Sequence, residues 1–236
     1  MLKKVLFLLV VINLTACKEL QQLAGTMLST DTLTDLDIGN GLKEALTIGV
    51  SDGADRLSLT DGYFKSAYKI LLPEEAQKVT SKLRNVPLFG NVEDIILEKV
   101  NRAAEDAAKS AKPIFVNAIK QMTFQDAANI LMGPDDAATQ FLNNATYNSL
   151  YSEFTPVIVN SLNKFNALDY WGNAVNSYNK IPFMQKLNPK LEDYVVQKAL
   201  QGLFSMVAKK EVDIRKNVSS RTSDLLQKVF AKQDNK

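Results

Sequence analysis

The segment NVEDIILEKVNRAAEDAAKSA, residues 91–111, decides the fold class of this chain. Its apolar residues recur three and four positions apart, which is the period of an α-helix that buries one face. That face consists of Ile95, Ile96, Val100, Ala103, Ala104, Ala107 and Ala111. Glutamates lie four positions before basic residues on the opposite face, as in Glu98–Arg102 and Glu105–Lys109, and such pairs stabilise an exposed helix surface. The segment therefore predicts an amphipathic helix whose alanines admit a close helical neighbour.

Helical signals continue along the rest of the chain. Pro113 breaks or kinks the first helix, and Thr123-Phe124-Gln125-Asp126 resembles a capping box in which Asp126 replaces Glu or Gln. Gly133-Pro134 then ends a helix. Further helices are expected from Gly41 onward, from Pro73 to near Pro87, and over 114–121, 135–145, 149–165, 168–179, 191–216 and 219–231. Strand signals are nearly absent, so we predict an all-α fold, with a single compact domain of about eight to ten helices.

Cys17, the only cysteine, closes the tetrapeptide Leu14-Thr15-Ala16-Cys17 behind the apolar run 5–12. Lys3 and Lys4 precede that run, so the first sixteen residues have the three parts of a secretory signal. The run is too short to cross a bilayer, which takes about 20 apolar residues. The tetrapeptide resembles the bacterial lipobox, in which the cysteine is acylated and becomes the first mature residue. We predict lipidation at Cys17; the alternative is an ordinary signal-peptidase site that happens to end in cysteine.

These signals divide the chain into a lipoprotein signal peptide (1–16), a lipidated N-terminus with a flexible tether (17–40) and a helical domain (41–232). A flexible tether of this length spans about 25 Å. Lys18 follows the cysteine, where an Asp would retain an enterobacterial lipoprotein in the inner membrane. We therefore expect the protein in the bacterial cell envelope, lipid-anchored at the periplasmic face of the outer membrane.

Composition excludes several kinds of chemistry. The chain has no histidine, and acylation of Cys17 would leave no thiol, which removes histidine triads, histidine metal sites and imidazole switches. Loss of the leader would leave 26 basic and 26 acidic side chains, without the basic cluster that nucleic acids require. Asp135-Asp136 is interpreted as the start of a helix, because calcium needs six to eight oxygen ligands. We expect no cofactor, no metal, no catalytic residues and no nucleic-acid partner.

Several blocks of the sequence together resemble a known family. They are GLKEAL (41–46), NRAAE (101–105), PIFVNAI (113–119), MTFQDA (122–127), ILMG (130–133), DAAT (136–139), YVVQKALQGLF (194–204) and RTSDLL (221–226). Their order and spacing over residues 38–230 resemble the DUF4197 family of bacterial, often lipoprotein-type, secreted proteins. The function of that family is unknown. The resemblance implies an all-helical periplasmic domain and supplies no catalytic residues.

Charged residues inside these blocks form the candidate polar site, which consists of Arg102, Asp126, Arg221 and Asp224. They would either line a pocket or form an ion-pair network, and arginine pairs bidentately with carboxylates. We favour a structural network that joins helix ends. The acids of the 91–111 helix are interleaved with basic residues and are interpreted as a solvated face rather than as acid–base catalysts; they are Glu93, Asp94, Glu98, Glu105 and Asp106.

Residues 141–183 contain nine aromatic residues and nine asparagines. Aromatic faces beside amide groups bind sugars or peptides by stacking and hydrogen bonding. The candidate aromatic binding surface consists of Tyr147, Tyr151, Tyr170, Trp171 and Tyr178. The alternative, which we favour, is an aromatic core with asparagines at helix ends and turns.

These observations favour a membrane-anchored periplasmic lipoprotein that is a non-enzymatic binding or scaffold module of the cell envelope. Its expected partners are the membrane, through acylated Cys17, and an envelope protein, glycan or lipid. Two alternatives remain open. One is a carrier that holds a lipid or other apolar ligand between helices. The other is a carboxylate-dependent envelope hydrolase, because glycoside hydrolysis needs two carboxyl groups roughly 5–9.5 Å apart and no histidine.

Overall fold

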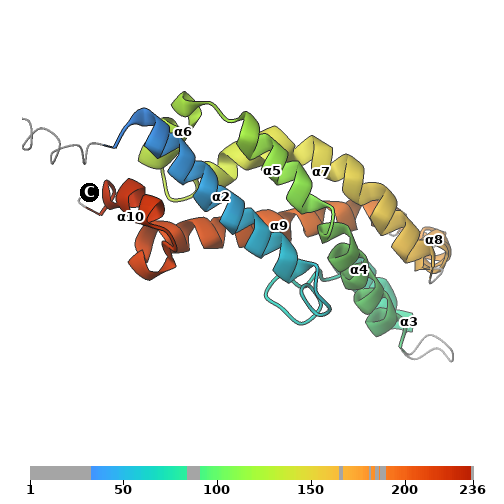
Figure 1. The fold of residues 1–236 in the computed structure, drawn as a ribbon. Helices are drawn as coiled ribbons and strands as arrows, with labels where there is room; N and C mark the ends of the chain where they lie inside the picture. The colour runs from blue at the N-terminus through green and yellow to red at the C-terminus, as the bar shows by residue number, and fades with distance from the viewer. Residues whose placement is uncertain are drawn as a thin grey trace, which may run out of the picture.

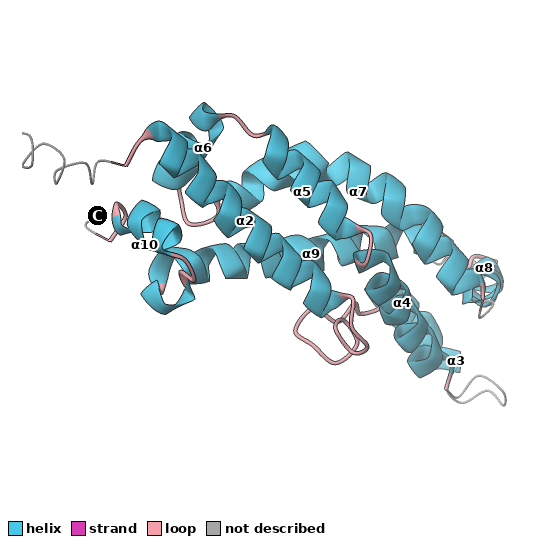
Figure 2. Cartoon of the chain, viewed as in Figure 1, coloured by secondary structure: helices cyan, strands magenta, loops and turns pink. Residues whose placement is uncertain are grey.

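The computed structural model describes residues 33–83, 91–164, 167–180, 182–183, 186 and 190–234. Every regular element in these residues is helical and none is a strand (Figures 1 and 2). The elements are α2 (Asp35–Leu57), α3 (Glu74–Leu83), α4 (Val92–Ala108), α5 (Ala111–Gln121), α6 (Phe124–Met132), α7 (Ala137–Asn163), α8 (Ala167–Tyr178), α9 (Leu191–Lys216), the 3-10 turn η1 (Val218–Ser220) and α10 (Asp224–Ala231). The predicted all-α fold with about eight to ten helices is confirmed.

Helices α7 and α9 form the centre of an elongated bundle. They pack against each other, α4 lies against α7, and α2 packs against α5, α6, α9 and α10. Helices α6 and α10 lie at the end of the molecule where α2 begins, whereas α3, α4 and α8 lie toward the opposite end (Figure 1). Phe115 of α5 meets Phe204 of α9 edge to face, with ring centroids 5.6 Å apart. One core therefore runs through the whole bundle.

Helix α4 buries the alanine face that the sequence predicted. Val100, Ala103, Ala104 and Ala107 are fully buried, and the small side chains allow α4 to pack closely on α7. Ile95 was assigned to the same face, but it is 54% exposed. It lies in the first turn of α4, four and seven residues before Lys99 and Arg102, and so it belongs to the helix face that carries charged side chains.

Helix α7 is a single helix of 27 residues, where two helices over 135–145 and 149–165 were expected. Thr146, at the expected break, donates its hydroxyl to the carbonyl of Leu142, 2.6 Å away. Leu142, Leu150 and Phe154 are fully buried on the same side of the helix. Burial of this continuous face outweighs the weak helix propensity of the Thr-Tyr-Asn stretch between the two expected helices.

Helix α2 begins at Asp35, so residues 35–40, which we expected in the tether, are helical. Thr34 and Asp37 form a capping box in which each side chain accepts a hydrogen bond from the backbone N–H of the other. The same Thr-x-x-Asp pattern caps α6 through Thr123 and Asp126. The predicted signal peptide, Cys17 and the helix end near Pro87 lie outside the described residues. No described helix is both long and apolar enough to span a bilayer.

Two glycines provide a test of the packing. A Cβ on Gly202 of α9 would lie 2.8 Å from Cε1 of Tyr63, whereas a Cβ on Gly172 of α8 would meet nothing within 4 Å. Gly202→Ala is therefore expected to lower the free energy of unfolding by about 1–3 kcal/mol through overpacking. Gly172→Ala is the matched control, expected to raise it by about 1 kcal/mol because alanine favours the helix. Urea denaturation measures both, and equal shifts would contradict the packing described.

Candidate functional site

The segment between α2 and α3, residues 58–73, has no regular helix, and side chains of α4 fix it in place. The amide of Asn101 binds both backbone groups of Ile70, accepting from its N–H at 2.8 Å and donating to its carbonyl at 2.9 Å. The carboxylate of Glu105 accepts from the backbone N–H groups of Tyr63 and Phe64, each at 3.1 Å. Glu105 is only 4% exposed. Its expected place on a solvated face, paired with Lys109, is therefore wrong: Glu105 satisfies buried backbone donors of this segment.

Arg102 links the same segment to α4 by charge. Its guanidinium donates to Glu105 and to Asp61, each at 2.8 Å, and lies over the ring of Phe64 at 5.1 Å. Asp61 has a positive φ of 69°, a left-handed conformation that aspartate tolerates better than most residues. Hydrogen bonds from Arg102 and Lys65 hold the pKa of Asp61 below its ordinary value. Arg102 therefore stabilises a turn and does not face the solvent as a free cation.

Helix α9 holds the segment from its other side. The hydroxyl of Tyr63 donates to the carbonyl of Ala199 at 2.7 Å, and that of Tyr194 donates to the carbonyl of Leu71 at 2.8 Å. Tyr63 is fully buried, and burial raises the pKa of its hydroxyl well above its ordinary value. Residues 58–73 are therefore held in place beside α9, and we call this segment the fixed wall.

Two adjoining surface hollows lie along α9, and we call them together the α9 groove. One, of about 470 Å³, lies between α7 and α9; the other, of about 320 Å³, lies between α9 and the fixed wall. Lys198, Gln201 and Ser205, exposed on α9, line both hollows, so the two adjoin along these side chains. The complete lining consists of Thr139, Asn143 and Tyr147 of α7, Tyr194, Gln197, Lys198, Gln201, Gly202, Phe204, Ser205 and Ala208 of α9, and Ala67, Tyr68, Lys69, Ile70 and Leu71 of the wall.

The α9 groove combines polar groups with apolar side chains such as Phe204, Ile70 and Leu71. Its lining contains amides, hydroxyls, tyrosine rings and two lysines, and it contains no Asp or Glu. Tyr147 stacks on Tyr151, with centroids 6.3 Å apart, and the hydroxyl of Tyr151 donates to Asp193. That hydrogen bond, together with burial, raises the pKa of Tyr151 to about 12. The stack gives Tyr147 a defined orientation at the groove.

The remaining aromatic candidates are not part of this surface. Trp171 is 3% exposed and belongs to the core, so its assignment to an aromatic binding surface is wrong. Tyr170 and Tyr178 lie on α8, and their side chains are outside the described part of the structure. Of the five candidates, the structure thus brings Tyr147 to the groove and Tyr151 directly behind it.

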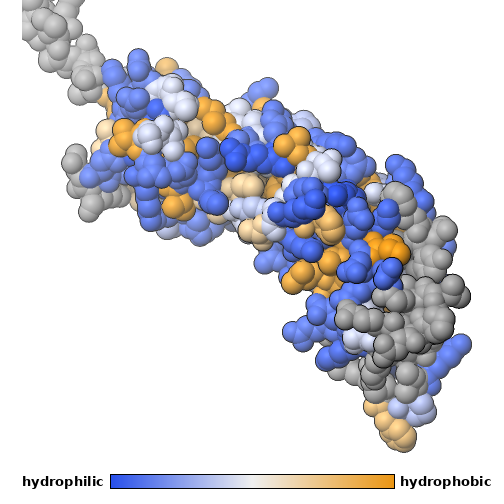
Figure 3. All heavy atoms as spheres, turned by 90° about the horizontal axis from the view of Figure 1, so that it is seen from below, coloured by the Kyte–Doolittle hydropathy of each residue, from blue (hydrophilic) through white to orange (hydrophobic). Residues whose placement is uncertain are grey.

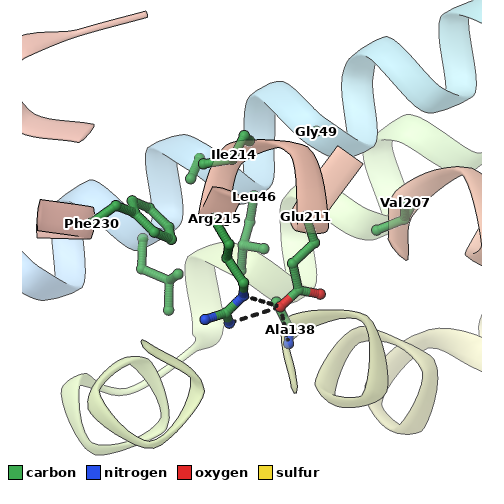
Figure 4. A pocket seen from close by; sticks show the side chains of 10 residues that line it. Leu46, Gly49, Ala138, Val207, Glu211, Ile214, Arg215 and Phe230 are labelled. Atoms are coloured by element: carbon green, nitrogen blue, oxygen red, sulfur yellow. Dashed lines mark hydrogen bonds and ion pairs between the residues drawn. The ribbon is translucent and has the colours of Figure 1, made fainter. Parts of the chain in front are cut away.

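A buried ion pair on α9, Glu211 with Arg215, joins α6 to α7 (Figure 4). The two groups are 2.8 Å apart, and their side chains are 5% and 3% exposed. The carboxylate accepts from the backbone N–H groups of Ala138 and Thr139 at the start of α7. The guanidinium donates to the carbonyl of Leu131 near the end of α6. One ion pair therefore satisfies the free backbone groups of two helix ends.

This arrangement corrects the role expected for Asp135-Asp136. Asp136 is the N-cap residue of α7 but makes no side-chain cap hydrogen bond, and Asp135 pairs with Lys216 on α9. The capping oxygens come from Glu211 instead. No group of three or more potential metal-ligating side chains occurs in the residues described.

A small apolar cavity of about 20 Å³ adjoins the ion pair. That volume corresponds to about one water molecule, which is far less than an acyl chain needs. Its walls come from α2, α7, α9 and α10, and Figure 4 shows Leu46, Val207, Ile214 and Phe230 around the pair.

The four candidate polar residues do not form one site. Arg221 is 2% exposed, donates to the carbonyls of Ile214 and Arg215 at the end of α9, and pairs with Asp234 at 2.6 Å. Asp126 belongs to the α6 capping box, and Asp224 is exposed in the first turn of α10. Arg102 lies on α4, toward the other end of the bundle (Figure 1). Three of the four act at helix ends, and Arg102 acts at a turn.

The sequence does contain a signal for the buried pair. The apolar face of α9 continues from Leu203 and Val207 in steps of four residues to Glu211 and Arg215. Opposite charges in the register of a buried face indicate an ion pair inside the core. Asn101 and Glu105 also lie four residues apart, but their partners are backbone groups far away in the sequence, which no local pattern reveals.

These features define an all-helical domain in which helix ends and one irregular segment are tied together by buried polar side chains. A family model described as "Protein of unknown function (DUF4197)" matches residues 32–231, and the chain belongs to this family. Neither the comparison with curated proteins nor that with solved structures finds a match. Two of the blocks that carried the resemblance have a structural role. In NRAAE (101–105), the side chains of Asn101, Arg102 and Glu105 bind the segment 58–73. In DAAT (136–139), the backbone N–H groups of Ala138 and Thr139 donate to Glu211.

Replacing Glu211 with alanine is expected to lower the free energy of unfolding by about 3–5 kcal/mol, because Arg215 would remain buried without its carboxylate. The control Asp106→Ala removes an exposed pair with Lys109 and is expected to cost less than about 1 kcal/mol. Chemical denaturation followed by circular dichroism measures both changes. Similar costs for the two variants would show that the buried pair contributes no more than a surface pair.

With Arg102→Gln, the pKa of Asp61 is expected to rise toward its ordinary value of 3.8, because only Lys65 would still stabilise the carboxylate. In the intact protein the lowered pKa means that the pair stabilises the fold above about pH 4 and that this contribution is lost as the pH falls through the lowered pKa. Carboxyl-carbon NMR titration measures the pKa directly. Lys109→Gln is the control, and an unchanged Asp61 pKa in Arg102→Gln would disprove the coupling.

Proposed function

We propose that this protein is a lipid-anchored, non-enzymatic binding module of the bacterial cell envelope, and that the α9 groove holds its partner. The observation that carries the proposal is the lining of the groove. It offers hydrogen-bonding amides and hydroxyls, tyrosine rings and two lysines, and hydrogen bonds to the backbone of Ile70 and Leu71 fix its non-helical wall. A preformed concave surface of this kind suits recognition, because little conformational entropy is lost on binding.

The N-terminal sequence supports the anchoring. Lys3 and Lys4, the apolar run and the tetrapeptide ending at Cys17 are the features of a lipoprotein leader. The family match begins at residue 32, after Cys17, which fits a domain that follows a tether. About 17 residues separate Cys17 from α2, and a flexible chain of that length spans roughly 20–25 Å. The groove would then act close to the membrane surface.

The surface chemistry favours a polar partner over the two alternatives. The apolar cavity of about 20 Å³ beside the Glu211–Arg215 pair offers no room for a lipid chain, which weighs against a carrier that holds its ligand there. The groove lining has no pair of carboxyl groups, which weighs against hydrolysis by two carboxylates there. Hydrophobic residues on the face shown in Figure 3 form small groups separated by hydrophilic ones. An envelope polymer with many polar groups, such as a glycan of the cell wall, therefore suits the groove.

A blocking substitution tests this proposal. Gln201→Trp would place a large ring where the two hollows meet, and it is expected to weaken binding of the unacylated Cys17→Ser chain to delipidated cell-wall material at least about tenfold. Gln125→Trp, at an exposed position of α6, is the matched control and should bind normally. Co-sedimentation measures the bound fraction. In cells, the unmodified chain should incorporate labelled palmitate and Cys17→Ser should not.

Three results would overturn the proposal. If no form of the chain binds cell-wall material, or if Gln201→Trp binds as well as Gln125→Trp, the groove is not the contact surface. If Cys17→Ser still incorporates palmitate, the anchor is not at Cys17.

A further inference from the structure

We propose that the partner held by the α9 groove is a linear anionic glycan, an oligosaccharide strand that carries carboxylate or phosphate groups. This inference rests on the proposed function and specifies the chemistry of the ligand. It follows from the shape of the groove, from its charge, and from the order in which aromatic, amide and cationic side chains occur along α9.

The shape of the groove suits a chain rather than a compact molecule. Its lining on α9 extends from Tyr194 to Ala208, which at 1.5 Å per residue is roughly 20 Å of helix. Both hollows are open to solvent, and the exposed side chains of Lys198, Gln201 and Ser205 lie where they adjoin. A strand of several sugar units would lie along the helix and contact α7 on one side and the fixed wall on the other.

The charge of the groove is positive. Lys198 and Lys69 are the ionisable cations of the lining, and no lining residue is an acid. The Nζ of Lys198 donates to Oε1 of Gln201 at 3.0 Å and lies over the ring of Tyr194 at 5.8 Å. An ammonium group has three donors, so Lys198 has donors left for an acidic group on the ligand. Asp193, close to Tyr194 in the sequence, already accepts from the Tyr151 hydroxyl.

The uncharged part of the lining suits sugar rings. Tyr147 stacks on Tyr151, so its ring is held in position before any ligand arrives. Tyr68 lies on the facing wall, whose backbone is fixed at Ile70 by Asn101. Sugar rings have apolar faces that stack on tyrosine and hydroxyls that bond to amides. The amide and hydroxyl groups for such bonds belong to Asn143, Gln197, Gln201 and Ser205.

Other polymers suit the groove less well. Two lysines are too few for a nucleic acid, whose binding depends on neutralising many phosphates. An acidic peptide would satisfy the lysines, but its carboxylate side chains have no ring face to stack on Tyr147 or Tyr68. A glycan uses the cationic, amide and aromatic groups of the lining together.

The test uses the full mature chain with Cys17→Ser and four defined probes, with affinities measured by isothermal titration calorimetry. The probes are maltotetraose, which is neutral; tetragalacturonate, which carries carboxylates; a phosphorylated maltotetraose; and a tetraglutamate peptide. At least one acidic oligosaccharide is expected to bind about tenfold more tightly than the neutral one at low salt, and the difference should shrink at high salt. Comparison of the carboxylated and phosphorylated probes identifies the acidic group.

Matched variants locate the binding. Lys198→Gln should weaken the acidic oligosaccharide about fivefold and leave the neutral one unchanged, because one exposed charge contact is lost. Lys120→Gln, an exposed lysine on α5 outside the groove, should change neither. Tyr147→Leu should weaken both oligosaccharides, whereas Phe124→Leu, an exposed aromatic residue on α6, should weaken neither. Thermal unfolding confirms that each variant is folded.

Three results would overturn the inference: equal affinity for neutral and acidic oligosaccharides, an unchanged affinity for the acidic one in Lys198→Gln, or tighter binding of tetraglutamate than of any oligosaccharide. Each would leave the proposed function standing if Gln201→Trp still abolishes cell-wall binding, since only the chemical class of the ligand would then be wrong. If Gln201→Trp does not weaken binding to cell-wall material, both proposals are wrong.

Discussion

The need to satisfy backbone groups at helix ends shapes this fold more than any other constraint. A bundle of short and long helices buries several ends, and each buried end brings carbonyl or N–H groups that lack a partner within the helix. Glu211 and Arg215 resolve this for α6 and α7 with one ion pair. Arg221 does the same for the end of α9. A buried ion pair adds little stability over an apolar pair of similar size, so its value here lies in fixing where two helices meet.

The same principle builds the α9 groove. An irregular segment beside a helix would normally be mobile, because its backbone bonds to water. Here Asn101, Glu105 and Tyr194 supply the partners that a regular element would have supplied. The segment is thus held by hydrogen bonds while presenting a different surface from that of a helix. A groove with one helical side and one non-helical side can display side chains in directions that two parallel helices cannot.

Local sequence patterns predicted the helices because their period and caps depend only on neighbouring residues. The bounds of α9, the break before Pro113 and the capping box at Thr123 all followed from such patterns. Patterns were less successful where burial decided the outcome, as in the continuous α7 and the buried Glu105. For the site, Tyr147 was found by composition. The groove itself could not be predicted, because Lys198 and Tyr68 are brought together by folding and not by spacing.

Helix α9 comes last among the long helices, yet it supplies partners to residues far upstream. Its side chains and carbonyls bind Tyr63, Leu71, Leu131 and Ala138. Until α9 has been synthesised, the irregular segment and the start of α7 have no acceptors or donors for their buried groups, and contacts this distant in sequence form late in folding. A chain exported through a membrane from its N-terminus would therefore stay open to the translocation machinery until its last fifth has passed. The buried hydrogen bonds of Tyr63 and Ala138 can form only once α9 is present.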